Sequence, residues 1–277
     1  MSIVVALLLG AGAARLVLLG GRHMFAAPAL ERQNYRNFTI AIVGGIVLVV
    51  VAMVAAATQA TLNAFDWIIG SVGAEALVLL TAVGFGFLGL LDDLLGASDT
   101  TGFRGHLRAL SRGHCTTGMI KLVGGGLLAL VVVGDRSSGA MFLVDAAVVA
   151  LAANAANLLD RRPGRLLKVA LLAYVPLALV AGTAPLGLAL APVFGAAIGI
   201  FPDDVRERIM LGDTGANALG ALLGVGVVYL CTPTARIVTL LVLIALNVAS
   251  EFVSFTKVID AVTPLRFVDQ LGRRRDG

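Results

Sequence analysis

Residues 141–160 read MFLVDAAVVALAANAANLLD, an apolar run of bilayer length that ends in two amides and a carboxylate. Asn154, Asn157 and Asp160 are three residues apart, so on an α-helix they lie on one side. A helix in the hydrocarbon of a bilayer has little reason to carry such a set unless that side faces protein, water or a ligand. The stretch therefore predicts a membrane-spanning helix whose polar end belongs to a binding site.

The composition of the whole chain is that of a membrane protein. Of its 277 residues 58% are hydrophobic and 14% are charged, whereas about a quarter of the residues in soluble domains are charged. The charges are gathered between apolar stretches of bilayer length, which indicates a polytopic α-helical membrane protein. Neither an internal repeat nor a break in composition divides the chain. We expect an all-α transmembrane helical bundle that forms a single integral membrane domain over residues 1–277.

The apolar segments predict about nine spans. A count of eight stays open, because the fourth and seventh segments are short or interrupted by glycine. The nine segments lie near residues 2–20, 39–59, 76–95, 119–134, 141–159, 166–182, 185–201, 214–231 and 235–255.

Basic residues predict the orientation of these spans. With the N-terminus outside, 18 of the 21 Lys and Arg residues fall in inside loops or at the inside ends of spans, and only Arg136 and Arg236 flank outside ends. By the positive-inside rule, the N-terminus is expected outside and the C-terminus in the cytoplasm, with the protein in the plasma membrane. The first span has no basic residue before it, so we expect an uncleaved anchor. The same rule explains the pI near 9.5, and no nucleic-acid partner is expected.

Paired carboxylates, Asp92 and Asp93, close the third span on the predicted cytoplasmic face. The dipole at the C-terminal end of a helix disfavours anions, and adjacent carboxylates repel each other, so a metal ion or a substrate proton would explain the pair. Lys121 lies just inside the next span, where a lysine usually has an anionic partner. Between them runs a basic stripe that fits lipid headgroups or a substrate phosphate, formed by Arg104, Arg108 and Arg112.

Asp213 opens the eighth span within the sequence Gly212-Asp213-Thr214-Gly215. An aspartate suits a helix N-cap, and glycines on both sides let backbone approach a ligand closely. The mixed-charge segment 202–208 before it reads as a solvated loop, and Glu251 in the ninth span as a candidate buried acid. Carboxylates with oxygen-rich neighbours and no paired Cys or His favour Mg²⁺, which usually works with substrate phosphates. We therefore expect phosphoryl chemistry at the cytoplasmic face of a membrane.

The order of the acidic motifs resembles that of a known superfamily. Asp92-Asp93, then Asn154-x-x-Asn157-x-x-Asp160, then Gly212-Asp213-x-Gly215 is similar to the polyprenyl-phosphate N-acetylhexosamine-1-phosphate transferases of glycosyltransferase family 4, which include the phospho-N-acetylmuramoyl-pentapeptide transferase. The segment 254–273 looks like the N-acetylglucosamine-1-phosphate branch. The resemblance runs from the first cytoplasmic loop to Arg275, which is nearly the whole chain.

The resemblance implies transfer of a sugar-1-phosphate from a UDP-sugar to a polyprenyl phosphate, with release of UMP, for cell-wall or surface-polysaccharide synthesis. It implies Mg²⁺ as cofactor with Asp213 as a metal ligand, and Asp92 or Asp93 assisting the attacking lipid phosphate. The expected partners are the UDP-sugar, the polyprenyl phosphate, the membrane and, as one option, a second copy of the chain in a homodimer. The substrate-binding residues that it implies are Asn34, Arg36, Lys121, Asn154, Asn157 and Asp160.

The chain departs from the family pattern at three places. Asp160 is followed by Arg161-Arg162-Pro163 instead of Gly-x-Asp-Gly, Gly96 replaces a lysine, and a histidine-rich loop is absent. A catalytically altered member with a binding or regulatory role is therefore the first alternative. A membrane prenyltransferase is less favoured, because those enzymes carry two Asp-rich motifs, whereas this chain has one Asn-rich motif and a Gly-Asp loop. A small transporter is disfavoured because the acids lie at the predicted membrane rim.

Overall fold

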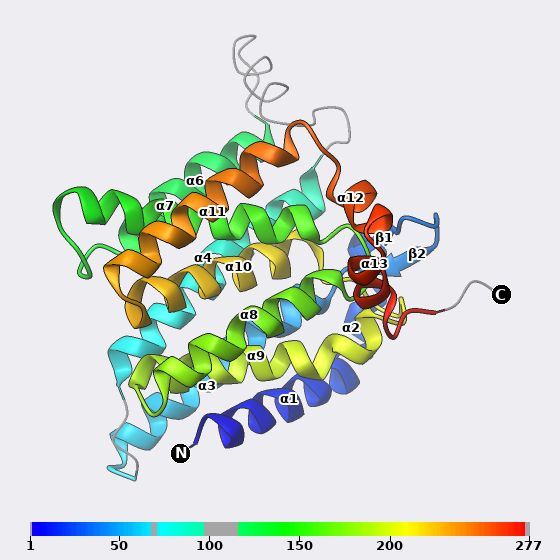
Figure 1. Ribbon diagram of the computed structural model, residues 1–277. Coiled ribbons are helices and arrows are strands. Elements are labelled where there is room, and N and C mark those ends of the chain that lie inside the picture. Colours follow the sequence, from blue (N-terminus) through cyan, green and yellow to red (C-terminus); the bar gives the residue numbers. More distant parts are fainter. Residues whose placement is uncertain (1, 68–70, 97–115, 275–277) are drawn as a thin grey trace.

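The computed structural model describes residues 2–67, 71–96 and 116–274, and within these ranges nine long helices follow the apolar segments (Figure 1). Seven are long and apolar enough to cross a membrane, whereas α6 and α8 have 16 and 17 residues. This part of the chain thus has the make-up of a polytopic helical membrane protein. The predicted basic stripe of Arg104, Arg108 and Arg112 lies outside the described residues. The long helices are α1 (Ile3–Gly20), α3 (Gly44–Ala64), α4 (Val72–Leu95), α6 (Thr117–Val132), α7 (Gly139–Leu159), α8 (Arg165–Ala181), α9 (Pro185–Asp204), α10 (Gly212–Leu230) and α11 (Pro233–Ser250).

Capping hydroxyls mark the starts of four of these helices, among them α1, where the Ser2 side chain accepts the Val5 N–H. The side chain of Ser71 accepts the Ala74 N–H before α4, and that of Thr116 accepts the Met119 N–H before α6. Thr232 does the same for α11, where Pro233 occupies the first helical position and needs no hydrogen-bond partner for its nitrogen. Each hydroxyl satisfies a backbone N–H that the helix itself leaves unpaired, so these boundaries follow from local sequence.

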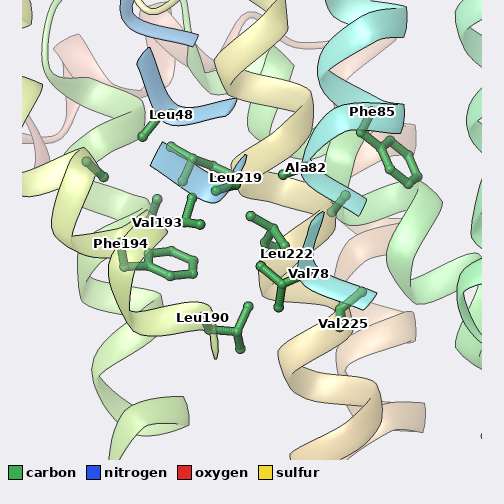
Figure 2. Close-up of a cluster of buried hydrophobic side chains, with 14 of the residues drawn as sticks. Leu48, Val78, Ala82, Phe85, Leu190, Val193, Phe194, Leu219, Leu222 and Val225 are labelled. Atoms are coloured by element: carbon green, nitrogen blue, oxygen red, sulfur yellow. The ribbon is translucent and has the colours of Figure 1, made fainter. Parts of the chain in front are cut away.

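The centre of the bundle is α10, the most buried of the candidate spans, which packs on α3, α4, α7 and α8. Figure 2 shows its side chains Leu219 and Leu222 among core residues from neighbouring helices, including Phe194 of α9. Small residues allow α7 to approach closely, because a Cβ added at Gly220 would lie 2.4 Å from the Ala152 carbonyl oxygen. The central position of α10 fixes where its N-terminal residues lie relative to α4 and α7.

The outermost candidate span is α11, which packs mainly against α7 and is the least buried of the seven. Its exposed side chains are apolar, for example Leu241, Ile244 and Val248. A helix with such a surface is stable where lipid covers it. The composition and burial of α11 therefore agree with a bundle embedded in a membrane.

Short elements gather at one end of the bundle, which we call the hairpin end (Figure 1). Two three-residue strands pair there in antiparallel register with Arg32 opposite Ile40, and this hairpin departs from the all-α prediction. A backbone bridge from Ile42 to Met210 joins the hairpin to the segment before α10. The short elements are α2 (Arg22–Phe25), the 3-10 turn η1 (Pro28–Leu30), β1 (Glu31–Gln33), β2 (Thr39–Ala41), α12 (Phe255–Ala261) and α13 (Thr263–Gln270).

A buried ion pair fastens α13 to the start of α8. Arg165 donates from Nε and Nη2 to the two carboxylate oxygens of Asp269 at 2.8 and 3.0 Å, and both residues are buried. Arg273 adds a third bond to Asp269 at 2.7 Å and also donates to the Pro163 carbonyl oxygen. Burial alone would raise the pKa of Asp269, but the Arg165 hydrogen bond and the two guanidinium charges lower it below its ordinary value. The C-terminal helices are thereby held against the connection between α7 and α8.

Candidate active site

A cavity of about 890 Å³ opens at the hairpin end, among the ends of α4, α6, α7, α10 and α11. Of the nine site residues predicted from the sequence, eight line it: Asn34, Asp92, Asp93, Lys121, Asn154, Asn157, Asp160 and Asp213. The ninth, Arg36, contacts the wall indirectly through Glu207, which does line the cavity. Residues from motifs far apart in the sequence are therefore neighbours in space.

Three of these residues surround the positive charge of a fourth, Lys121. The Lys121 ammonium lies 2.9 Å from Asp92 Oδ2 and 2.5 Å from Asp213 Oδ2. In the orientation of the Asn157 amide that satisfies its neighbours, the oxygen accepts from Lys121 Nζ at 2.8 Å and the nitrogen donates to Asp213 Oδ1 at 2.7 Å. We call Asp92, Lys121, Asn157 and Asp213 the Lys121 cluster. Its members come from α4, α6, α7 and α10, so the cluster forms only when the four helix ends meet.

Asp93, the neighbour of Asp92, has a different set of partners. Its Oδ1 accepts the Asp213 N–H at 2.9 Å, and its Oδ2 accepts the Thr214 N–H at 2.9 Å and the Thr214 hydroxyl at 2.6 Å. These groups begin α10, where the helix dipole favours an anion. A close approach of α4 to α10 makes these bonds possible, since a Cβ at Gly89 would lie 2.2 Å from the Asp213 carbonyl oxygen. Asp93 thus holds the start of α10, and with it Asp213, at the cavity wall.

A second group of carboxylates lies beside the Lys121 cluster. Burial, followed by the charges of Asp204, Asp213 and Asp93, raises the pKa of Asp160 well above the usual range of an aspartate. Asp204 is 5% exposed and accepts the Gly164 N–H at 2.7 Å. The prediction of a solvated loop at 202–208 is therefore wrong for Asp204, because α9 continues as a helix to this residue and carries it inside. Such a concentration of negative charge attracts cations.

The hairpin forms the opposite wall of the cavity. Asn34 donates to Glu207 at 2.8 Å, and Arg36 pairs with the same carboxylate at 3.4 Å. The guanidinium of Arg162 stacks 4.1 Å from the centre of the Tyr35 ring. Sequence reasoning missed Tyr35, Arg162 and Glu207, because no short spacing relates the hairpin to the other two segments. The side chain of Glu207 is 5% exposed, so the solvated-loop prediction is wrong here too.

Two predicted polar residues lie nearer the edge of the site. Asn154 is exposed, and its amide donates to Asn247 Oδ1 of α11 at 2.6 Å while the residue also lines the cavity. Glu251, expected as a buried acid, is exposed just after α11 because that helix covers little of the bundle. Asn154 therefore joins α7 to α11, and Glu251 contributes to the cavity rim.

The oxygen atoms around Lys121 fit a hard cation. In the described part of the chain, no three His, Cys, Asp or Glu side chains are grouped so that they alone could hold a metal ion. Two carboxylates and an amide oxygen nevertheless converge on the ammonium, and oxygen donors of this kind are those that Mg²⁺ accepts while keeping several waters. Asp92, Asp213 and Asn157 would hold the ion if the Lys121 side chain withdrew.

No protein-family model matches this sequence. The function must therefore be inferred from the chemistry of the site, since a helical membrane bundle by itself does not specify one.

Proposed function

We propose that this protein is a Mg²⁺-dependent transferase that moves a sugar-1-phosphate from a UDP-sugar to a polyprenyl phosphate at the cytoplasmic face of the plasma membrane. The observation that carries the proposal is the Lys121 cluster, where residues from all three ordered acidic motifs and Lys121 meet in one cavity. The order of these motifs resembles that of the polyprenyl-phosphate N-acetylhexosamine-1-phosphate transferases.

In the proposed reaction, an oxygen of the lipid phosphate attacks the β-phosphorus of the UDP-sugar. A new P–O bond forms while the bond from the β-phosphorus to the bridging oxygen breaks, and UMP leaves with that electron pair. The products are UMP and a polyprenyl diphosphate-linked sugar. A lipid phosphate is largely dianionic near neutral pH, with a second pKa of about 6 like that of other phosphate monoesters, so the attacking oxygen needs little help from a base. Positioning and charge neutralisation are then the main demands on the protein.

The two neighbouring aspartates have different roles in the proposed reaction. Asp92 faces the cavity and Lys121, so it is the carboxylate that positions the reacting phosphates. Asp93 acts on the reaction through Asp213, whose backbone it holds. Bound Mg²⁺ would neutralise phosphate oxygens at Asp92, Asp213 and Asn157. Lys121, released from its two carboxylates, would then donate to the same phosphates.

The walls of the cavity suit one polar and one lipid substrate. Apolar side chains continue from the cluster along α4 and α6, among them Phe85, Leu88 and Leu122. Leu122 is 51% exposed on α6, so the cavity reaches the outer side of the bundle, where a membrane lipid can enter. On the other side Arg161 and Arg162 line the cavity, and these guanidiniums suit the diphosphate of a nucleotide-sugar. Their position after Asp160 is where the chain departs from the family pattern.

The test is UMP release by the purified protein in detergent with polyprenyl phosphate, Mg²⁺ and a panel of UDP-sugars. Asp213→Asn should abolish release, because it removes a charged oxygen donor from the Lys121 cluster. Asp203→Asn is the matched control, since Asp203 pairs with Arg15 and Arg208 and does not line the cavity. Nucleotide binding without UMP release from any sugar would favour the catalytically altered alternative. Absence of nucleotide binding would contradict the transferase.

A further inference from the structure

Asn217 carries a buried amide that the protein does not satisfy. It follows Asp213 by four residues on α10 and therefore lies on the same side, about 6 Å deeper along the helix. The residue is 3% exposed and lines the cavity, and its Nδ2 has no hydrogen-bond acceptor among the described residues. Leaving a buried donor unpaired destabilises a fold, so an amide at this place suggests that a ligand supplies the acceptor.

Other amides inside the bundle are paired. Asn247 of α11 donates to the Leu151 and Leu243 carbonyl oxygens at 3.2 and 2.7 Å and accepts from Asn154. These bonds hold helices together, as amides in membrane bundles commonly do. Asn217 does not have this role, because its nitrogen has no such partner in the described part of the chain. Packing alone therefore does not account for a polar residue at position 217.

The lining of the cavity changes from charged to apolar near Asn217. Toward the hairpin end lies the Lys121 cluster, which is charged. The wall at the level of α4 and α6 is apolar, with Phe85 beside Gly125 and with Ala153 of α7 also in the lining. An amphiphile with its anionic group at the cluster would carry its chain along this wall. Its phosphate would then lie where polar lining gives way to apolar lining.

We propose that Asn217 Nδ2 donates a hydrogen bond to the phosphate of the polyprenyl phosphate and so sets the depth at which the lipid substrate sits. This inference rests on the proposed transferase function and assigns a binding residue to its lipid substrate. A charged acceptor makes the stronger kind of hydrogen bond, which suits an amide shielded from water. A UDP-sugar is polar along its whole length and matches instead the opposite wall, with Arg161, Arg162 and the hairpin.

The test measures the affinity of the purified protein for farnesyl phosphate, a short prenyl phosphate, by calorimetry in detergent. Asn217→Leu removes the donor, and Asn217→Ala does so without adding bulk, in case the leucine variant fails to fold. Each should weaken farnesyl phosphate binding about tenfold or more while leaving UDP affinity unchanged. Thr81→Val is the matched control, because the Thr81 hydroxyl is buried in α4, donates to the Leu77 carbonyl oxygen and does not line the cavity. It should leave both affinities unchanged.

The possible results separate this inference from the proposed function. Asn217 variants that bind UDP and farnesyl phosphate as the wild type does would overturn the inference, even if the wild type releases UMP. Variants that lose UDP affinity instead would also overturn it, because the amide would then serve the nucleotide. A wild-type protein that binds farnesyl phosphate through Asn217 but never releases UMP would support the inference and contradict the transferase. Absence of farnesyl phosphate binding by the wild type would contradict both.

Discussion

Asp93 Oδ2 accepts both the backbone N–H of Thr214 at 2.9 Å and its hydroxyl at 2.6 Å, across 121 residues of sequence. With the Asp213 N–H on Oδ1, this carboxylate caps α10 from the end of α4. Consecutive residues on a helix point about 100° apart, so Asp92 does not join this cap and its carboxylate meets the side chains of Lys121 and Asp213 instead. Two adjacent acids that look equivalent in the sequence therefore have different partners.

Exchanging each acid for asparagine should separate the role of Asp92 in the proposed reaction from the role of Asp93 in capping α10. Asp92→Asn is expected to lower UMP release at least 100-fold with little change in the melting temperature, because Asp92 is part of the proposed site and not of a helix cap. Asp93→Asn should lower the stability by about 1–2 kcal/mol, since an amide cannot accept from all three donors that begin α10. UMP release and thermal unfolding in detergent measure the two effects. Equal loss of stability in both variants would contradict the assignment.

The close approach of α4 to α10 should make Gly89 intolerant of a side chain. An added Cβ would lie 2.2 Å from the Asp213 carbonyl oxygen and 2.5 Å from the Thr214 nitrogen, both of them backbone atoms that cannot move aside alone. Gly89→Ala should therefore destabilise the protein by about 1–3 kcal/mol. The control is Gly12→Ala in α1, where a Cβ meets nothing within 4 Å. A Gly89→Ala protein with the melting temperature of the control would argue against the observed helix separation.

Asp269→Asn should loosen the C-terminal helices by leaving Arg165 buried without its anion. Losing one partner of a buried ion pair costs on the order of 3 kcal/mol, and the melting temperature should fall accordingly. The pKa of Asp269 is lowered in the folded protein. The ionised carboxylate therefore adds to the free energy of unfolding above the unfolded pKa of about 3.9, and this stabilisation is lost as the pH falls through the folded pKa. The difference in the free energy of unfolding between the wild type and Asp269→Asn should thus be constant from pH 7 to 5 and shrink below about pH 4. A difference that grows on acidification would refute this assignment.

The Asn154–Asn247 bond predicts an energetic coupling between α7 and α11. Amide pairs in membrane bundles contribute about 0.6 kcal/mol on average, so a double-mutant cycle with Asn154→Ala and Asn247→Ala should give a coupling of that size. UMP release should fall less in Asn154→Ala than in Asn157→Ala, because Asn157 belongs to the Lys121 cluster. A coupling of zero would show that the Asn154–Asn247 bond does not hold α7 to α11. Equal losses of UMP release in Asn154→Ala and Asn157→Ala would place Asn154 among the substrate-binding residues.

The positions of the long helices were predictable because hydropathy depends only on local composition. Each of the nine apolar segments contains a helix within five residues of its expected ends, from a close match at Gly139–Leu159 (expected 141–159) to a shift of five residues at Gly44–Ala64 (expected 39–59), where β2 occupies the first residues. The polar motifs meet because the end of α4, the start of α6, the end of α7 and the start of α10 all line one cavity. The β1–β2 hairpin was missed because its strands have three residues each, too few to show a period of two.

The partners within the site were not predictable, because they depend on how each helix is rotated about its axis. Hydropathy leaves that rotation open, so it could not assign Asp92 to Lys121 and Asp93 to Thr214. The burial of Asp204 follows from one further turn of α9, beyond the end that apolarity alone suggests. Asn217 was overlooked because a single amide within an apolar span resembles interhelical packing until its lack of a partner among the described residues is seen.

The proposed transfer of the β-phosphate to the lipid can be followed directly. Purified protein, Mg²⁺ and polyprenyl phosphate are incubated with a UDP-sugar labelled with ³²P in its β-phosphate, and the lipid is extracted into organic solvent. For at least one UDP-sugar, we expect label in the lipid fraction with an equal amount of UMP, and neither with Asp213→Asn. Label that stays in the aqueous fraction for every sugar, from protein that binds both substrates, would contradict it.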